Sequence, residues 1–485
     1  MSMMYIPRVI GRGAGCIAVV LWLLGSGPAG AQVEQPAPKA ERDEDFDDAP
    51  AAKAAGSVRA PRHTNSQWWR WALRAPLYPV RGAWWVTWSV PRLGLWAYDR
   101  YQVKDRLRSI FFNDTGTTGI FPVAFFETGF GLNVGGRLVM KDLFGHEEKF
   151  RVRASYGGQF RQLYTAKFAT GKLFGDFAEA ELISSYQIYP KSQFFGIGPA
   201  DENEDFAGGR PLIDPVAETE AVDTRFRHDD LRVELGMLGH ITAELTVRVS
   251  GAYTVRDFGD EADAPMEEQI EQVYDPTRLV GFEDGLSNIY TEVELTYDTR
   301  RVSQFYLSVA APSTGWKLGG FAGYRKGIGD DPSDHFRWGA DALRLFDLYR
   351  GDRVLLLRAY AEGVTGSMNE IAFVDLPRLG GPTFLRGYVR DRFRDRNVTL
   401  GTIEYQYPIE RNFGGYLFVD AGRVWRELED FELDNFRVGY GGGIQAHSVN
   451  GFLTRFYISS SIDGGLLFNL SFDPVFDTRS REESP

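Results

Sequence analysis

Cysteine and long apolar runs are both scarce in this 485-residue sequence. The one cysteine, Cys16, lies in an apolar run at 14–25 that follows Arg8 and Arg12 and precedes the small residues 29–31. A basic region, an apolar core and small residues in this order predict a secretory signal peptide over residues 1–31. Cleavage after Ala31 would leave a mature chain without cysteine, which excludes disulfide bonds and thiol chemistry.

The run at 14–25 is also the only stretch that reads as an apolar helix, and the mean hydropathy is −0.28. These observations exclude a bundle of membrane helices. The alternative for the run, an N-terminal membrane anchor, is disfavoured because the apolar core is too short to span a bilayer.

Histidine is scarce as well, with six in the chain, and the common hydrolase motifs G-x-S-x-G and H-E-x-x-H do not occur. The nearest approach to a catalytic cluster is His228-Asp229-Asp230, which we interpret as a polar strand end. We therefore expect no enzyme activity, no metal and no cofactor. The net charge of −12 argues against general nucleic-acid binding.

Aromatic residues and glycine are abundant by contrast. Phe, Tyr and Trp make up 14% of the chain, and there are 54 glycines. This composition favours many strands joined by tight turns.

Two segments precede the strand-rich part. Residues 32–66 are rich in Pro, Ala and acids, which predicts a disordered linker. Residues 67–117 combine arginine with tryptophan, which suits short helices lying in a membrane interface, although the core of a small soluble domain is the alternative. The tryptophans expected at the interface are Trp68, Trp69, Trp71, Trp84, Trp85, Trp88 and Trp96.

Residues 118–472 read as strand, turn, strand almost without interruption, followed by a tail at 473–485. Residues 241–254 alternate apolar and polar side chains, as do residues 466–472, which end on Phe472. Alternation alone does not say which face is inside. Export, the long series of strands and a final strand that closes on an aromatic residue favour a β-barrel in the outer membrane, with its apolar face toward lipid.

The length of this region sets the number of strands. About 350 residues divided by roughly 22 for each tilted strand and its connection gives about sixteen antiparallel strands. An even number closes a barrel with both ends on the periplasmic side. Long polar connections at 200–223, 259–286 and 327–335 are expected to be extracellular loops or lid elements.

Charges of both signs are set into strand-like sequence at 380–425. Leu385-Arg386-Gly387-Tyr388 lies in an arginine-rich loop, and Phe418-Val419-Asp420-Ala421-Gly422 lies in a strand two segments later. The first resembles the R-G-F/Y loop motif, and the second the F-x-D-x-G strand motif, of the bacterial surface antigen superfamily of outer-membrane assembly factors, which contains the BamA and TamA barrels. The resemblance covers roughly residues 118–472. It implies a sixteen-stranded barrel whose sixth extracellular loop enters the lumen and docks its arginine on the wall.

The residue pattern agrees with that implication. Alternation along 398–409 directs Ile403, Tyr405 and Tyr407 to lipid and Glu404 to the lumen. The same reasoning along 415–425 directs Phe418, Asp420 and Gly422 inward, and Gly422 leaves room for a second backbone. Arg386 offers a planar fork of donors for the two carboxylates, and Gly387 permits a sharp loop tip. The alternative is a solvated loop that Arg386 shares with Arg390, Arg392, Arg394 and Arg396.

The resemblance implies insertion or translocation of polypeptide, or of lipid, at the bacterial outer membrane. The expected partners are outer-membrane lipid, client polypeptides and a periplasmic protein. Family members usually carry periplasmic polypeptide-transport-associated domains of about 75 residues before the barrel, and residues 66–120 leave no room for one. A porin-like or structural barrel with a loop-plugged lumen therefore stays open as the alternative.

Overall fold

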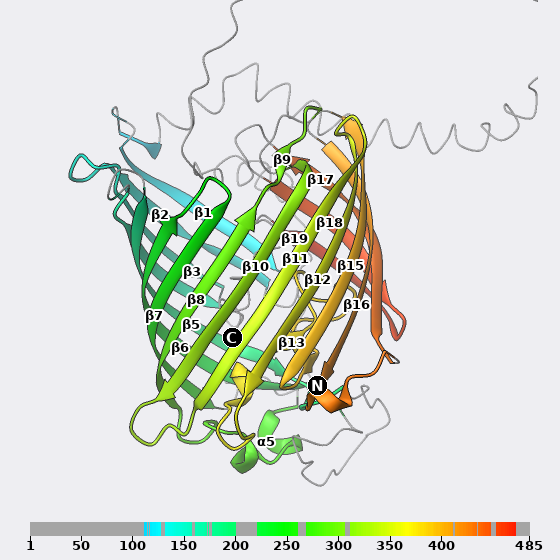
Figure 1. Ribbon diagram of the computed structural model, residues 1–485. Helices are drawn as coiled ribbons and strands as arrows, with labels where there is room; N and C mark the ends of the chain where they lie inside the picture. Colours follow the sequence, from blue (N-terminus) through cyan, green and yellow to red (C-terminus); the bar gives the residue numbers. More distant parts are fainter. Residues whose placement is uncertain are drawn as a thin grey trace, which may run out of the picture. The chain divides into compact units, whose positions relative to one another are not determined.

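The computed structural model of the protein is a β-barrel (Figure 1). It describes residues 111–113, 115, 117–127, 131–157, 161–171, 173, 177–199, 221–259, 268–305, 311–410, 413–433, 435–447 and 453–471. The expected signal peptide, the linker at 32–66, the seven tryptophans of 67–117, Phe472 and the tail at 473–485 lie outside these residues.

Seventeen strands form one sheet, in which β9 (Arg301–Val302) only extends the edge of β10. The other sixteen are wall strands, and each pairs antiparallel with the next along the chain. The prediction of an all-β barrel of about sixteen antiparallel strands is confirmed. The wall strands are β1 (Thr118–Glu127), β2 (Gly131–Lys141), β3 (Lys149–Tyr156), β4 (Gln162–Ala169), β5 (Ala178–Phe194), β6 (Thr224–His240), β7 (Leu245–Gly259), β8 (Leu286–Asp298), β10 (Pro312–Gly327), β11 (Asp334–Tyr349), β12 (Arg353–Thr365), β15 (Asn397–Glu410), β16 (Phe413–Trp425), β17 (Arg437–His447), β18 (Leu453–Ser461) and β19 (Gly464–Ser471).

The longest connections lie at one end of the barrel. Long connections at 195–223, 260–285 and 366–396 share one end, which we call the loop end and which lies at the bottom of Figure 1. Short connections such as 241–244 and 350–352 share the other end, the turn end. With an even number of wall strands, β1 starts and β19 ends at the turn end. The two strands lie next to each other, but no ladder joins them within the described part of the chain.

Short helices occur only in connections within the described residues. They are α5 (Ile270–Val273), η1 (Pro276–Arg278), η2 (Phe373–Asp375) and η3 (Leu428–Asp430). No described helix is long and apolar enough to cross a membrane. Two further strands, β13 (Arg378–Leu379) and β14 (Phe393–Arg394), pair with each other inside the connection 366–396.

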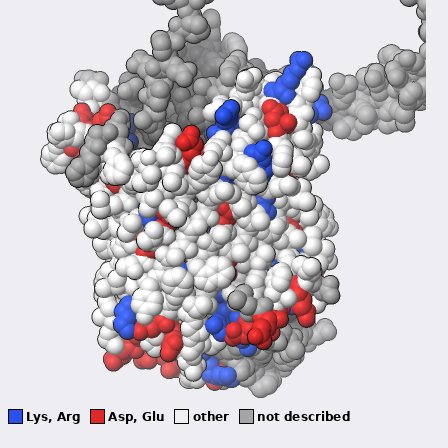
Figure 2. Space-filling model, in the orientation of Figure 1, with Lys and Arg blue, Asp and Glu red and all other residues white. Residues whose placement is uncertain are grey.

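Side chains alternate between the outside and the lumen along the wall strands. Leu417 and Val419 of β16 are about half exposed, whereas Phe418 and Asp420 between them are buried. The outward positions are mostly apolar, and the inward positions carry most of the charge. Figure 2 shows the same division, with acidic side chains gathered at the loop end and uncharged surface dominating the middle of the barrel. This distribution is typical of a barrel that crosses a membrane.

One strand boundary differs from the prediction. Residues 241–244 form the turn between β6 and β7, so β7 begins at Leu245 and not at Ile241. The Thr242 hydroxyl accepts hydrogen bonds from the backbone N–H groups of Glu244 and Leu245. A side chain that bonds to its own backbone in this way stabilises a turn, although the apolar alternation runs through it.

Candidate functional site

The connection 366–396, which we call the docked loop, folds into the barrel. It leaves the wall at the end of β12 and returns at the start of β15. Its β13–β14 hairpin places apolar side chains against the inner wall in one buried cluster. The cluster joins Leu379, Leu385, Tyr388 and Phe393 of the loop to Tyr360, Val398, Leu400 and Val424 of the wall. Burial of these apolar side chains therefore favours the docked position of the loop, independently of any charged contact.

The guanidinium of Arg386 lies between two wall carboxylates. Its Nε and Nη2 donate to the two carboxylate oxygens of Asp420 at 2.8 Å each, and its Nη1 donates to Glu404 at 2.7 Å. The backbone N–H of Arg386 donates to Asp420 as well, at 2.9 Å. Arg386 is 2% exposed, Asp420 1% and Glu404 0%. This is the bidentate geometry in which an arginine–carboxylate pair is strongest.

Neighbouring side chains complete this charged cluster. The ring of Phe418 lies 3.6 Å from the Arg386 guanidinium carbon, so the cation stacks on an aromatic face. Arg455 of β18 donates to the other oxygen of Glu404 at 2.5 Å and stacks on Tyr416 at 3.8 Å. Burial opposes the charged form of Arg386, but Asp420 and Glu404 outweigh it and raise the pKa of Arg386 above its ordinary value.

The backbone beside Arg386 touches the wall directly. Gly387 has φ +105°, which favours glycine, and an added Cβ would meet the Ser460 carbonyl of β18. On the wall, an added Cβ at Gly439 of β17 would collide with the Arg386 carbonyl oxygen. Close approach of the two backbones therefore requires glycine on both sides.

Tyr388 fixes the loop near the barrel rim. Its hydroxyl donates to Asp463, between β18 and β19, at 2.7 Å. Burial and this hydrogen bond raise the pKa of Tyr388 above its ordinary value. Asp463 also accepts from Arg437, which in turn donates to the Pro199 carbonyl after β5. Tyr388 thus links the docked loop to the connection between β18 and β19 and, through Asp463 and Arg437, to the connection after β5.

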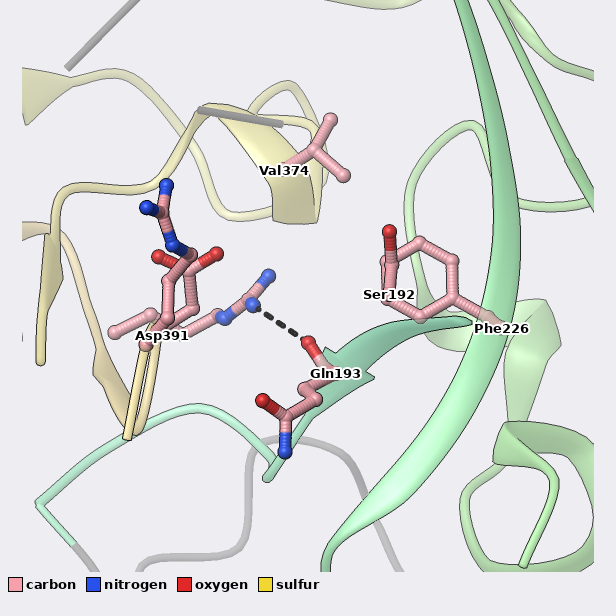
Figure 3. A pocket seen from close by; sticks show the side chains of 7 residues that line it. Ser192, Gln193, Phe226, Val374 and Asp391 are labelled. Atoms are coloured by element: carbon pink, nitrogen blue, oxygen red, sulfur yellow. Dashed lines mark hydrogen bonds between the residues drawn. The ribbon is translucent and has the colours of Figure 1, made fainter. Parts of the chain in front are cut away.

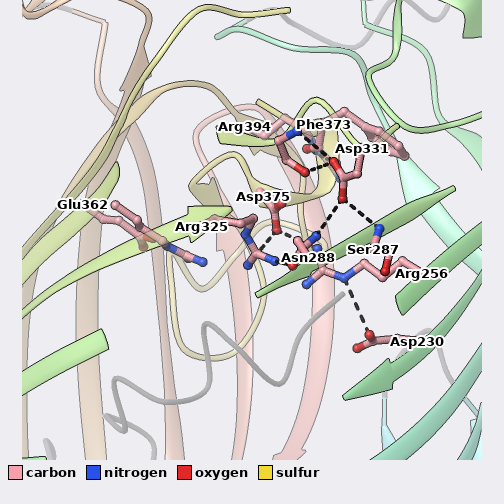
Figure 4. Close-up of polar contacts among 12 residues, drawn as sticks. Asp230, Arg256, Ser287, Asn288, Arg325, Asp331, Glu362, Phe373, Asp375 and Arg394 are labelled. Carbon is pink, nitrogen blue, oxygen red and sulfur yellow. Dashed lines mark hydrogen bonds and ion pairs between the residues drawn. The ribbon is translucent and has the colours of Figure 1, made fainter. Parts of the chain in front are cut away.

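A second charged contact holds the first half of the docked loop (Figure 4). Asp375, at the end of η2, accepts from Arg256 of β7 at 2.6 Å and pairs with Arg325 of β10 at 3.2 Å. Arg325 also donates to Asn288 of β8 at 2.6 Å, and Arg256 lies 3.6 Å from Asp230 of β6. Burial opposes ionisation of Asp375, but Arg325 and Arg256 hold the pKa of its carboxyl well below the usual range.

An apolar core lies next to this contact, in the mouth of the barrel at the loop end. It combines Phe194 and Phe226 of the wall with Tyr274 after α5 and Phe373 of the docked loop. Arg394 lies beneath it, donating to the carbonyls of Phe373 and Gln193, and burial lowers the pKa of Arg394 to about 10. Figure 3 shows the small pocket here, which Arg394 lines together with Ser192, Gln193 and Val374. The docked loop and the described parts of two other connections therefore pack together at the mouth.

The structure brings several of the expected site residues together. Arg386, Glu404 and Asp420 meet inside the barrel, Gly387 forms the loop tip, and Phe418 faces the lumen. At Gly422 an added Cβ would meet the Leu379 side chain of the docked loop and the Thr399 carbonyl oxygen of the neighbouring strand. Arg392 and Arg394 are buried, so the docked loop is not a solvated one.

Sequence reasoning missed the residues whose role depends on distant pairing. Arg455 lies two strands beyond Asp420, and Gly439 looks like any other glycine of a glycine-rich strand. Asp375 follows an apolar segment, which gave no sign that two wall arginines would surround it. No group of three His, Cys, Asp or Glu side chains in the described ranges is arranged to hold a metal ion.

The family model of the Omp85 superfamily domain matches residues 142–455, which is more than half of the chain and includes both charged contacts of the docked loop. Among solved structures, the fold is similar to BamA from Haemophilus ducreyi lacking POTRA domains 1–3, with a TM-score of 0.52 and 12% identity over 73% of this chain and 69% of that one.

Two structures of CdiB are also similar. CdiB from Acinetobacter baumannii gives a TM-score of 0.43 and 11% identity over 72% of this chain and 58% of that one. CdiB from Escherichia coli gives 0.45 and 13% over 73% and 60%. This chain thus spans less than two thirds of either CdiB chain. No curated protein sequence matches it.

Proposed function

Because the chain belongs to the Omp85 superfamily of outer-membrane β-barrel proteins, we propose that it aids insertion or translocation of polypeptide, or of lipid, at the outer membrane. In this proposal the docked loop is a latch whose position determines whether the barrel is plugged. The observation that carries it is the burial of Arg386 between Asp420 and Glu404.

The chemistry of that contact supports a latch more than a simple strut. Apolar residues of similar volume often hold a protein interior together as well as a buried ion pair does. Ion pairs differ in what happens on separation, because each charged group regains water once the loop moves out. A charged contact therefore fixes one docked position while keeping the undocked position accessible.

The partners in this proposal are outer-membrane lipid and a client polypeptide or periplasmic protein. Photo-crosslinking in cells tests it, with the crosslinker placed at Val389 of the docked loop or at Leu433 of the connection between β16 and β17. Both side chains are exposed at the loop end. Polypeptide adducts from position 389 that are absent from position 433 would support the proposal, and identical adducts from both positions would contradict it.

The apolar core in the barrel mouth favours a second candidate, a porin-like or structural barrel with a plugged lumen. Conductance across planar bilayers separates the two. A latch predicts a silent wild-type protein and currents from a variant that lacks both Arg386 and Asp375. Large, stable currents from the wild-type protein would favour the porin-like barrel.

A further inference from the structure

Arg344 of the wall faces outward instead of into the lumen. Arg344 of β11 shares its face with Phe336 and Phe346, which are exposed, whereas Arg337 and Asp341 on the other face are buried. In the register of the sheet Arg344 lies directly opposite Trp316 of β10, which is 43% exposed. The guanidinium therefore belongs to the lipid-facing surface of the barrel.

Two aromatic rings flank this guanidinium. Its central carbon lies 5.0 Å from the ring centre of Trp316 and 5.0 Å from that of Phe346. No hydrogen bond or ion pair joins Arg344 to another residue of the described part of the chain. Outward arginines near the loop end differ, since Arg227 pairs with Asp229 and Arg423 lies 3.6 Å from Glu432.

The position of Arg344 along the barrel indicates what it meets. It lies near the end of β11, which finishes at Tyr349 at the turn end. Exposed arginines at that end include Arg300, Arg301, Arg350 and Arg353. Figure 2 shows basic side chains near the top of the view. Short turns face the periplasm in bacterial barrels, and long loops face outward. Arg344 is therefore on the side of the periplasmic leaflet, which consists of phospholipid.

We propose that Arg344, Trp316 and Phe346 form a binding site for the phosphate of an anionic phospholipid headgroup in the periplasmic leaflet. A cation on a lipid-facing strand extends its charged end toward the interface, where phosphate is the available anion. Stacking on the two rings keeps the planar guanidinium in one orientation, with its N–H edge free to bind phosphate oxygens in pairs. The rings also suit the depth of the headgroups, where aromatic side chains collect.

Lipid selectivity measures this site directly. The full chain is reconstituted in nanodiscs of phosphatidylcholine that contain a minor fraction of spin-labelled phosphatidylglycerol, or of spin-labelled phosphatidylcholine for comparison. The wild-type protein should enrich phosphatidylglycerol at its surface, and Arg344→Gln should lower that enrichment by about fivefold, the factor for loss of one cation near an anionic surface. Arg344→Lys should keep part of the enrichment because it retains charge but not the planar fork.

The matched control is Arg423→Gln, which removes an outward arginine that already has a carboxylate neighbour. It should leave the selectivity unchanged. Trp316→Leu gives a second variant of the same site and should also lower the enrichment. Equal selectivity in wild type and Arg344→Gln, or equal loss in Arg423→Gln, would overturn the proposal. Gel mobility before and after heating establishes that each variant is folded.

Discussion

The docked loop is fixed at two places with opposite arrangements of charge. At Arg386 the loop supplies the cation and the wall supplies the carboxylates of Glu404 and Asp420. At Asp375 the loop supplies the carboxylate and the wall supplies Arg256 and Arg325. Each half of the loop thus carries the charge opposite to that of its wall partners, so that exchanging the two halves would place like charges together.

The two contacts also reach different parts of the wall. Arg386 bonds to β15 and β16, and through Glu404 it shares a carboxylate with β18. Asp375 reaches back to β7 and β10. Since the loop begins at β12 and ends at β15, its halves spread in opposite directions around the barrel. One location and one orientation satisfy both contacts.

The largest effect should come from Arg386→Ala. This change leaves Asp420 without its two guanidinium hydrogen bonds, and loss of one member of a buried pair typically costs about 3–5 kcal/mol. Water in the lumen should bring the cost toward the lower end. The measurement is the free energy of unfolding in urea for protein folded into lipid vesicles, followed by tryptophan fluorescence.

Arg396→Ala is the matched control, because Arg396 lies in the same loop but pairs with the exposed Glu427. Exposed pairs contribute about 0–1 kcal/mol. If Arg386→Ala and Arg396→Ala destabilised the barrel equally, the contrast between a buried latch and a surface pair would be lost.

A smaller effect is expected from Asp375→Asn. The amide still accepts a hydrogen bond, but it leaves Arg256 and Arg325 without their shared anion, a loss of about 1.5–3 kcal/mol for hydrogen bonds to a charged group. Asp230 and Asn288 remain to compensate in part. Combining it with Arg386→Ala tests independence: distant sites should add within about 0.5 kcal/mol, and a large deviation would mean that the loop docks as one unit.

Tyr388→Phe should cost less again. It removes one hydrogen bond to Asp463 while keeping the ring in the apolar cluster, a loss of about 1 kcal/mol in unfolding free energy. The loss of unfolding free energy caused by Arg386→Ala should be about the same with and without Tyr388→Phe. A loss as large as that of Arg386→Ala would place the principal contact at the rim instead of at the charged cluster.

Acid should weaken the Asp375 contact, and only slightly above pH 4. The folded pKa of Asp375 is lowered, so its stabilisation is fully present above the unfolded value of about 3.9 and declines as the pH falls below it. The difference in unfolding free energy between wild type and Asp375→Asn should be constant from about pH 7 to about pH 4 and narrow below that. A difference that already narrows near pH 6 would assign the effect to another group.

The barrel was accessible from sequence because it depends on local pattern, and the Arg386 contact because its two motifs resemble those of a known superfamily. Alternation in β15 and β16 assigns Ile403 and Val419 to one face and Glu404 and Asp420 to the other, and a short motif marks the loop tip. An inward carboxylate on a strand pair needs a cation, and the arginine-rich loop offers one.

The Asp375 contact, Arg455 and Gly439 were not accessible, for a common reason. Each depends on how strands far apart in the chain are arranged around the barrel wall, and on how far a loop reaches inside it. Arg256 and Arg325 look alike in sequence to other inward arginines such as Arg248, which pairs with Glu181 and Glu234 across neighbouring strands. Only the position of the docked loop determines which of these arginines pair with Asp375.

The paired glycines Gly387 and Gly439 have a mechanical consequence. Where they meet, the loop backbone rests on the wall without an intervening side chain, so force on one is transmitted to the other with little compliance. Together with the contacts to β7 and β10, this makes the docked loop an internal brace. The docked loop thus stiffens the wall strands from β7 to β18 from inside the barrel.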